Sequence, residues 1–221
     1  MKKLLFLLGF ALFLAACNNS NDNTADADTT AAKGEEEPEV DAETALLQNN
    51  MPQLFAYLSN SDSSFSPQQF DMTGTRDLDT SVTTPVTEKQ MEMFRTCLVF
   101  SPDSSQALDL FSYNYVLVPT RDGGIRAEQG GPDTEAALID FKSGIRKRIY
   151  FSGPSSALLD ARWLPDGTFL LAGGEVLTRN RLLPFIWKVD PRSNRIDVYS
   201  YSDTLQATAD SYKRTLCKFL Q

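Results

Sequence analysis

Between residues 97 and 201 the chain carries two copies of one order of short apolar runs and turn residues. This repeat restricts the possible folds more strongly than any other feature of the sequence. In the first copy an apolar run leads into Ser101-Pro102-Asp103, and a later run ends at Asp140. In the second copy Leu164-Pro165-Asp166-Gly167 and Asp190 hold the corresponding places. Proline and aspartate at such positions favour tight turns, and short apolar runs between turns are typical of strands. The pattern predicts a mainly β fold of antiparallel sheets.

The first turn of each copy also carries a family resemblance. Phe100-Ser101-Pro102-Asp103 and Trp163-Leu164-Pro165-Asp166-Gly167 resemble the hairpin of TolB-like and WD-type β-propeller repeats. The resemblance implies blade-like repeats at about 97–151 and 159–201. Two blades cannot close a ring, which normally has about four or more. We therefore expect an open assembly of antiparallel sheets, α+β at its edges.

Short helices are expected beside the sheets. Residues 41–60 place leucine and phenylalanine at helical spacing, with Pro52 as an interruption and Asn50 as a candidate cap of the second short helix that Pro52 begins. Thr87-Glu88-Lys89-Gln90 matches a capping box, which predicts a short helix over 88–96.

Three further segments complete the folded part. Residues 61–86 are rich in Ser, Asp, Thr and Pro, and we expect an irregular loop that wraps the body. Residues 120–134 contain two glycine pairs and are expected to form a mobile loop. Apolar residues at helical spacing predict a closing helix over 203–219.

The first residues have the three parts of a signal peptide. Lys2 and Lys3 precede an apolar run of 11 residues, Leu4 to Leu14, and small residues follow it. This run is too short for a bilayer core, which needs about 20 residues.

Leu14-Ala15-Ala16-Cys17 ends that run and resembles the lipobox of bacterial lipoproteins. The resemblance implies that residues 1–16 are removed and that Cys17 carries the lipid that holds the chain at a membrane. Two alternatives are a plain secretory signal cleaved after Ala16 and an uncleaved short anchor.

Residues 17–40 are polar and acidic, and they carry too few apolar side chains to offset the entropy of ordering. We expect a lipidated N-terminus and a disordered tether there, with a single globular domain over 41–221. Acidic runs near the lipidated cysteine are surface-export signals in lipoproteins of the Bacteroidetes type, which this chain resembles. Asn18-Asn19-Ser20-Asn21-Asp22 matches that signal poorly, so the leaflet stays open.

Charge and composition exclude several classes of function. The chain has 21 basic and 29 acidic residues; without residues 1–16 it has 19 basic residues and a net charge of −10. An acidic chain lacks the basic footprint of nucleic-acid binding. The chain contains no histidine, which excludes Ser-His-Asp and Cys-His catalysis and histidine-ligated metals.

Cys97 and Cys217 remain once Cys17 is assigned to lipid. They could form a disulfide that joins the front of the folded part to its C-terminal end. The alternative is two buried thiols that pack as small apolar groups.

Several acidic residues are candidates for chemistry. Five of them could supply the acid pair of a glycosidase, although four lie in or beside predicted turns. These are Asp103, Asp109, Asp140, Asp166 and Asp190. Calcium binding by Asp190, Asn194 and Asp197 lacks the EF-hand spacing.

Three other groups have mainly structural interpretations. Arg146-Lys147-Arg148 is expected on a solvated strand face or edge. Core packing is expected for four aromatic residues that could alternatively form an exposed sugar platform. These are Trp163, Trp187, Tyr199 and Tyr201. Gly130-Gly131 and Gly173-Gly174 lack the lysine and helix of a phosphate loop.

These observations predict a non-catalytic, membrane-anchored lipoprotein of the cell envelope that binds or scaffolds an envelope protein or glycan. They predict no enzyme activity, no cofactor, no metal and no nucleic-acid partner, with the outer membrane as the expected location. The alternative is a carboxylate-dependent lipoprotein that binds or cleaves glycans.

Overall fold

The computed structural model describes residues 41–217 and 219, with the backbone alone for 88–90 and 213–216. The predicted signal segment 1–16, the lipidation at Cys17 and the tether 17–40 lie outside the described residues. The described residues belong to one compact unit.

The helices and 3-10 turns are α1 (Ala42–Asn50), α2 (Pro52–Ser61), η1 (Pro67–Gln69), α3 (Glu88–Phe94), η2 (Arg95–Cys97) and α4 (Ala209–Leu216). The strands are β1 (Phe70–Asp77), β2 (Thr83–Pro85), β3 (Val99–Phe100), β4 (Gln106–Asp109), β5 (Tyr115–Pro119), β6 (Ile125–Gln129), β7 (Thr134–Asp140), β8 (Ile145–Ser152), β9 (Ser156–Trp163), β10 (Phe169–Thr178), β11 (Arg181–Asp190) and β12 (Arg195–Tyr201).

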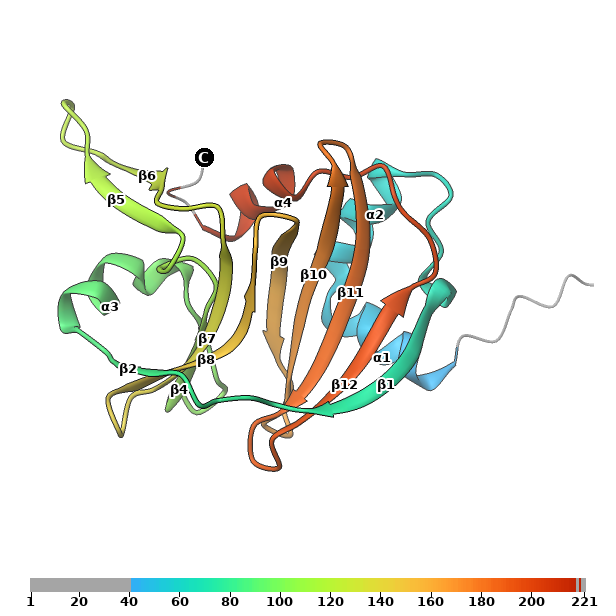
Figure 1. Ribbon diagram of the computed structural model, residues 1–221, viewed down its shortest axis with the longest axis horizontal. Coiled ribbons are helices and arrows are strands. Elements are labelled where there is room, and N and C mark those ends of the chain that lie inside the picture. Colours follow the sequence, from blue (N-terminus) through green and yellow to red (C-terminus); the bar gives the residue numbers. More distant parts are fainter. Residues whose placement is uncertain (1–40, 218, 220–221) are drawn as a thin grey trace, which may run out of the picture. The chain divides into compact units, whose positions relative to one another are not determined.

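Two five-stranded sheets dominate the described residues, and the predicted mainly antiparallel β architecture is confirmed. Sheet A has the order β1-β12-β11-β10-β9, and sheet B has the order β2-β8-β7-β4-β3. Each sheet is a four-stranded meander with one outer strand from an earlier segment, and sheet B has the β5-β6 hairpin inserted between β4 and β7 (Figure 1). The described strands do not close a ring, and the structure does not establish propeller blades.

The first turn of each copy has the same geometry. Asp103 accepts hydrogen bonds from the backbone N–H and the hydroxyl of Ser105, and Asp166 accepts the same pair from Thr168. The residue after each aspartate has positive φ, 57° at Ser104 and 82° at Gly167. Turn chemistry therefore predicted these hairpins correctly.

The second turns are equivalent as well. Asp140 and Asp190 accept from backbone N–H groups of their own turns, and positive φ follows at Gly144 (66°) and Asn194 (52°). The outer strands attach next to them in the same way. Val86 N–H donates to the Gly144 carbonyl at 2.9 Å, and Leu78 N–H donates to the Asn194 carbonyl at 2.7 Å.

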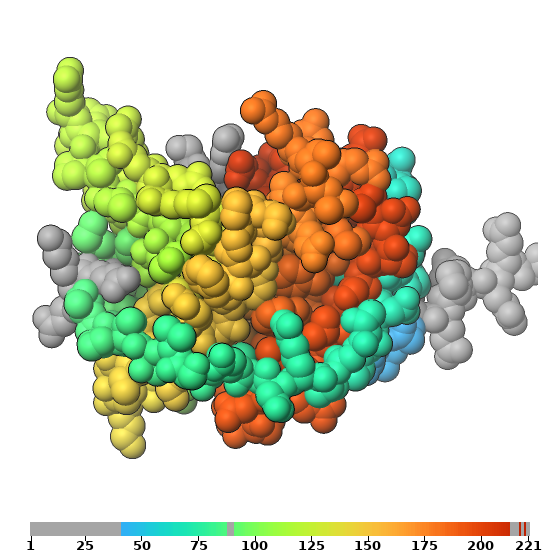
Figure 2. Space-filling view, viewed as in Figure 1, coloured from blue at the N-terminus to red at the C-terminus, as the bar shows by residue number. Residues whose placement is uncertain are grey.

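The expected irregular loop over 61–86 is wrong in part. This segment does wrap the body, but it does so as β1 and β2, which pair with β12 and β8 (Figure 2). Nearly all of its strand residues are exposed, because these are edge strands. The sequence consequently lacks the apolar alternation that marks a half-buried strand.

The expected mobile loop over 120–134 is also wrong in part. It contains β6, which pairs with β5 in a hairpin that stands apart from the two sheets (Figure 1). Likewise, α4 covers only Ala209–Leu216 of the closing helix predicted over 203–219. The chain before it is held by a backbone pairing of Leu205 with Leu182, which replaces helical hydrogen bonds.

The helices α1 and α2 follow the predicted break at Pro52. The prediction that Asn50 caps the second helix is wrong, because the N-cap of α2 is Met51, which makes no side-chain capping bond. Asp41 caps α1, with its carboxylate accepting from the N–H groups of Glu43 and Thr44. Asn50 lies inside α1 and donates to the Leu46 carbonyl at 2.8 Å. The predicted helix over 88–96 is present as α3 followed by η2.

Two apolar clusters hold the body together. One lies between the sheets and includes Leu108 and Leu138 of sheet B with Leu171 and Ile196 of sheet A. The other joins the opposite face of sheet A to α1 and α2. Sheet A is therefore buried on both faces, which explains why β10 begins with six consecutive buried residues.

The two remaining cysteines are joined. Cys97 at the end of η2 and Cys217 after α4 form a disulfide, with their Cα atoms 4.7 Å apart. Both belong to the cluster between the sheets. The bond ties the start of the sheet B repeat to the chain segment that follows sheet A.

Candidate functional site

Four of the five candidate carboxylates hold turns, as their sequence positions predicted. A hydroxyl or N–H from the same turn lowers the pKa of three of them: the Ser101 hydroxyl at Asp103, the Thr168 hydroxyl at Asp166 and the Ser143 N–H at Asp140. At Asp190 the Arg192 side chain has the main effect and also lowers the pKa. These groups are dispersed over separate turns and do not form an acid pair.

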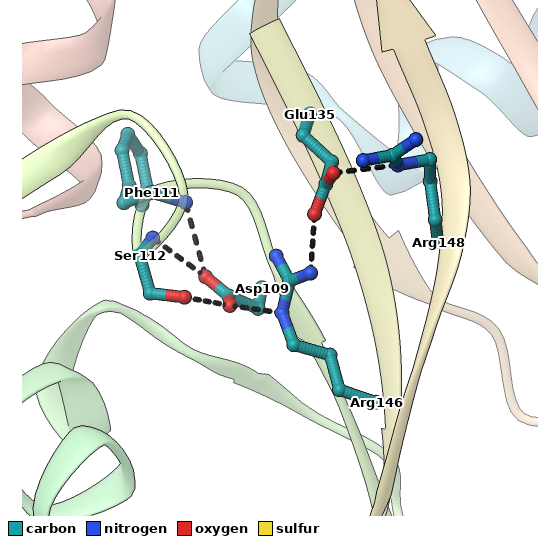
Figure 3. A network of polar contacts seen from close by, with 6 residues as sticks. All are labelled: Asp109, Phe111, Ser112, Glu135, Arg146 and Arg148. Atoms are coloured by element: carbon teal, nitrogen blue, oxygen red, sulfur yellow. Dashed lines mark hydrogen bonds and ion pairs between the residues drawn. The ribbon is translucent and has the colours of Figure 1, made fainter. Parts of the chain in front are cut away.

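Asp109 also holds a turn but differs from the other four in being buried, at the end of β4. One carboxylate oxygen accepts from the N–H groups of Phe111 and Ser112, at 3.1 and 2.9 Å. The other oxygen accepts from the Ser112 hydroxyl and from Arg146 Nε, the latter at 3.1 Å (Figure 3). Asp109 therefore fixes the turn after β4 and forms an ion pair with the Arg146 guanidinium.

Arg146 is the centre of this network. Its Nε binds Asp109 and its Nη1 binds Glu135 of β7, while Arg148 Nε binds the second oxygen of Glu135 at 2.6 Å. Burial alone would lower the pKa of Arg146, but the carboxylates of Asp109 and Glu135 outweigh burial and raise it, so the guanidinium stays charged. The expected solvated face is wrong for Arg146, which is only 9% exposed.

The third guanidinium nitrogen of Arg146, Nη2, is buried and has no hydrogen-bond partner in the structure. In Figure 3 this nitrogen lies between the Ser112 turn and Glu135, and no dashed line reaches it. A buried charged donor without a partner costs about 1–3 kcal/mol or more. Such a group is uncommon in native structures and requires an explanation.

A cleft of about 260 Å³ opens over these side chains. Glu135, Arg146 and Arg148 line it together with Val82, Thr84, Ser112 and Tyr113. We call this the arginine cleft.

Exposed apolar side chains lie at the arginine cleft, where Val82 and Tyr113 line it and Phe151 lies next to Tyr113 and Arg148. Tyr113 is 45% exposed, Val82 44% and Phe151 47%. The rings of Tyr113 and Phe151 meet edge to face at 6.0 Å, and the Arg148 guanidinium lies 4.5 Å from the Phe151 ring centre. The site therefore combines buried charge with an apolar rim.

The aromatic residues singled out in the sequence lie elsewhere. Trp163, Tyr199 and Tyr201 are buried in the two clusters, which confirms the core interpretation for them. Trp187 is partly buried against Tyr150, with Arg76 3.8 Å above its ring. None of these four forms an exposed platform.

The glycine pair in β10 serves packing. A Cβ on Gly173 would lie 2.5 Å from the Phe185 ring, and one on Gly174 would lie 2.6 Å from Leu182. Such contacts are too close for any larger residue without rearrangement of these neighbours. The sequence therefore needs glycine here for close packing, which agrees with the absence of a phosphate-loop pattern.

The residues considered for calcium are engaged with other partners. Asp197 accepts from Thr75 and Arg195, and Asp190 accepts from Arg192. Within the described residues, no three His, Cys, Asp or Glu side chains are grouped to hold a metal.

The two sheets can be aligned by their turns, and the alignment locates the arginine cleft. When Asp140 in the second turn of sheet B is aligned with Asp190 in that of sheet A, Arg146 corresponds to Ile196 and Arg148 to Val198. In the strand before this turn, the same alignment matches Glu135 with Phe185. In sheet A these positions face the cluster that lies between the sheets.

Sequence reasoning missed Glu135, Tyr113 and Phe151. Comparison of the two repeats contains a usable signal for Glu135, because charges replace apolar residues at matching strand positions. Tyr113 and Phe151 carry no comparable signal, since their exposure depends on how the turn after β4 meets β8.

Comparison with known proteins gives one result. Residues 1–18 match the model of the prokaryotic membrane lipoprotein lipid attachment site. The chain carries a lipoprotein attachment signal. This supports a bacterial lipoprotein associated with a membrane through lipid. No curated protein and no solved structure matches the chain. Within the described residues, no helix has the length and apolar character needed to cross a bilayer.

Proposed function

We propose that this chain is a non-catalytic binding module of the bacterial cell envelope, anchored by lipid on Cys17 and binding its partner at the arginine cleft. The observation that carries the proposal is the buried, unpartnered Nη2 of Arg146 in an open cleft. A binding site can use such a donor, whereas the fold alone gains nothing from it. The outer membrane is the proposed location.

The chemistry of the cleft favours binding over catalysis. Glu135 lines it but is held by two arginines, and Asp109 is held by Arg146 and its own turn. A glycosidase needs one carboxyl group as an acid and a second one across the scissile bond. Here both buried carboxylates are committed to ion pairs, which supports the non-catalytic function over the glycan-cleaving alternative.

The resemblance of the two repeats to β-propeller blades is part of the same proposal. The common strand order and the two pairs of equivalent turns support the interpretation of each sheet as a propeller-like blade. Propeller-type repeats often serve as binding surfaces, and this analogy agrees with the proposed role.

Lipid attachment has a direct test. Cells grown with labelled palmitate should label the wild-type chain and not the Cys17→Ser variant. Cys97→Ser is the matched control and should keep the label, because Cys97 is bound to Cys217 inside the body. Equal labelling of wild type and Cys17→Ser would contradict the anchor.

Partner binding is tested by cross-linking in intact envelopes. A specific partner should be captured by wild type and lost with Arg148→Gln, which alters the cleft at a side chain that is 31% exposed. Arg162→Gln, an exposed arginine on β9 in sheet A, is the control and should retain the partner. Identical capture by all three chains would remove the cleft from the proposal.

A further inference from the structure

We infer that the arginine cleft receives a single carboxylate whose neighbouring group is apolar, the end of a larger molecule. This inference rests on the proposed binding function and specifies its ligand chemistry. Four features of the cleft support it: guanidinium N–H groups without an acceptor, the charge balance, the apolar rim and the size.

The donors come from two guanidinium groups. Arg146 uses Nε and Nη1 for its carboxylates, which leaves the N–H groups of Nη2 without an acceptor. Arg148 donates to Glu135 through Nε, and its terminal nitrogens have no acceptor among the described residues. A carboxylate offers two oxygens in one plane, a geometry that suits donors from neighbouring guanidinium groups.

The charge balance favours one negative charge over two. Arg146 and Arg148 are matched by the carboxylates of Asp109 and Glu135, so the network is neutral as it stands. A dianion such as a phosphate monoester would meet two nearby carboxylates in a site of low dielectric, where repulsion is strong. A monoanion satisfies the donors with less repulsion.

The rim indicates the neighbouring group. Tyr113, Val82 and Phe151 are large apolar side chains, each exposed by more than two fifths, beside the charged floor. Aromatic rings at the edge of a polar site bind apolar surface while a polar tip stays in water. An aryl or alkyl group next to the carboxylate would lie against them.

The size of the cleft restricts how much of the ligand enters. About 260 Å³ is below the usual range of small-molecule sites, which is roughly 300–1,000 Å³. One carboxyl group and its first neighbouring atoms fit, and the remainder lies over the rim. The carboxyl terminus of a peptide and a free carboxylic acid share this chemistry.

The test is a ligand-observed NMR titration of the full chain carrying Cys17→Ser, which removes the lipid. The probes are 3-phenylpropionate, N-acetylphenylalanine, 3-phenylpropionamide and phenyl phosphate. We expect saturable binding of the acids, about millimolar for such small fragments. The amide and the phosphate should bind at least about tenfold more weakly, since neither offers a single negative carboxylate. N-acetylphenylalanine binding at least about tenfold tighter than 3-phenylpropionate indicates a peptide terminus, and the reverse indicates a free acid.

Variants separate the site from the fold. Arg148→Gln should weaken 3-phenylpropionate at least about tenfold, and the Arg162→Gln control should leave it unchanged. Arg146→Lys keeps the positive charge but removes the fork of nitrogens, and it should lose binding while its NMR spectrum stays that of a folded chain. Tyr113→Ala should weaken binding of the acid and leave the ion pairs intact.

Three results would overturn the inference: amide binding equal to acid binding, a preference for phenyl phosphate, or no saturable binding by any probe. The proposed function fails separately, when envelope capture does not depend on Arg148. Capture that depends on Arg148, with no carboxylate preference, would leave the binding function standing and reject this ligand class.

Discussion

Sheet A and sheet B share a strand order and two equivalent turns, yet matching positions carry opposite chemistry. Ile196, Val198 and Phe185 of sheet A face the cluster between the sheets. Arg146, Arg148 and Glu135 occupy the corresponding positions of sheet B and form ion pairs.

The difference lies in what covers each face. The face of sheet A is covered by sheet B, where Tyr150 of β8 meets Trp187 of β11 with ring centres 5.0 Å apart. The corresponding face of sheet B opens into the arginine cleft. A repeated backbone therefore tolerates either apolar or ionic side chains, and burial by a second layer selects the apolar set.

The disulfide should have the largest effect, because it joins the start of the sheet B repeat to the segment after sheet A. Its cysteines are 120 residues apart, and the chain-entropy model gives about 4–5 kcal/mol for a loop of that length. We expect Cys97→Ala/Cys217→Ala to lose about that much unfolding free energy in urea. Reductant should destabilise wild type similarly and leave the double variant unaffected; an unchanged midpoint in the variant would contradict this.

Removing one partner of the ionic network should have the next largest effect. Glu135→Ala leaves Arg146 and Arg148 without a shared carboxylate, and breaking a buried pair costs about 3–5 kcal/mol. The control is Glu128→Ala, which breaks an exposed pair with Arg126 and should cost no more than about 1 kcal/mol. Equal losses in denaturant unfolding would show that the network is not effectively buried.

Asp160 of β9 offers a smaller test, since its partner is a tyrosine instead of an arginine. Burial raises the pKa of this carboxyl above 3.8, against the opposing hydrogen bond that Tyr212 OH donates at 2.5 Å. The folded state therefore holds a proton that the unfolded chain has already released. This contribution to stability is present below pH 3.8 and is lost as pH rises through the folded pKa.

Asp160→Asn removes that titration. Its unfolding free energy should decline less than that of wild type as pH rises from about 4 to about 7, as measured by urea unfolding at each pH. Asp166→Asn is the matched control at a turn where the Thr168 hydroxyl lowers the pKa, and it should remove stability that wild type gains as pH rises. A steeper decline in Asp160→Asn would reverse the assigned direction.

Local chemistry was predictable from the sequence. Pro102-Asp103 and Pro165-Asp166 specify their turns through side-chain bonds to neighbouring N–H groups, and Pro52 separates two helices. The edge strands β1 and β2 escaped prediction because exposed strands need no apolar alternation. Their pairing depends on partners far along the chain.

The candidate site was predictable only in part. Asp109, Arg146 and Arg148 were noticed, but their burial was not, since charged residues are almost never fully buried unless paired. The pairing joins three strands, and Glu135 lies 11 residues from Arg146 along the chain. Only the assembled sheet brings these charges together.

The most direct test of the comparison converts the ionic face of sheet B toward the apolar chemistry of sheet A. The variant is Asp109→Asn/Glu135→Leu/Arg146→Met. The amide oxygen introduced at position 109 keeps an acceptor for the N–H groups of Phe111 and Ser112. Replacing a buried ionic network by apolar residues is often neutral or stabilising by about 1–4 kcal/mol.

We predict that calorimetric titration of this triple variant with 3-phenylpropionate shows no binding, while its urea midpoint equals or exceeds that of wild type. That result would establish that the charges serve binding and not the fold. Unimpaired binding, or a variant that fails to fold, would contradict the account.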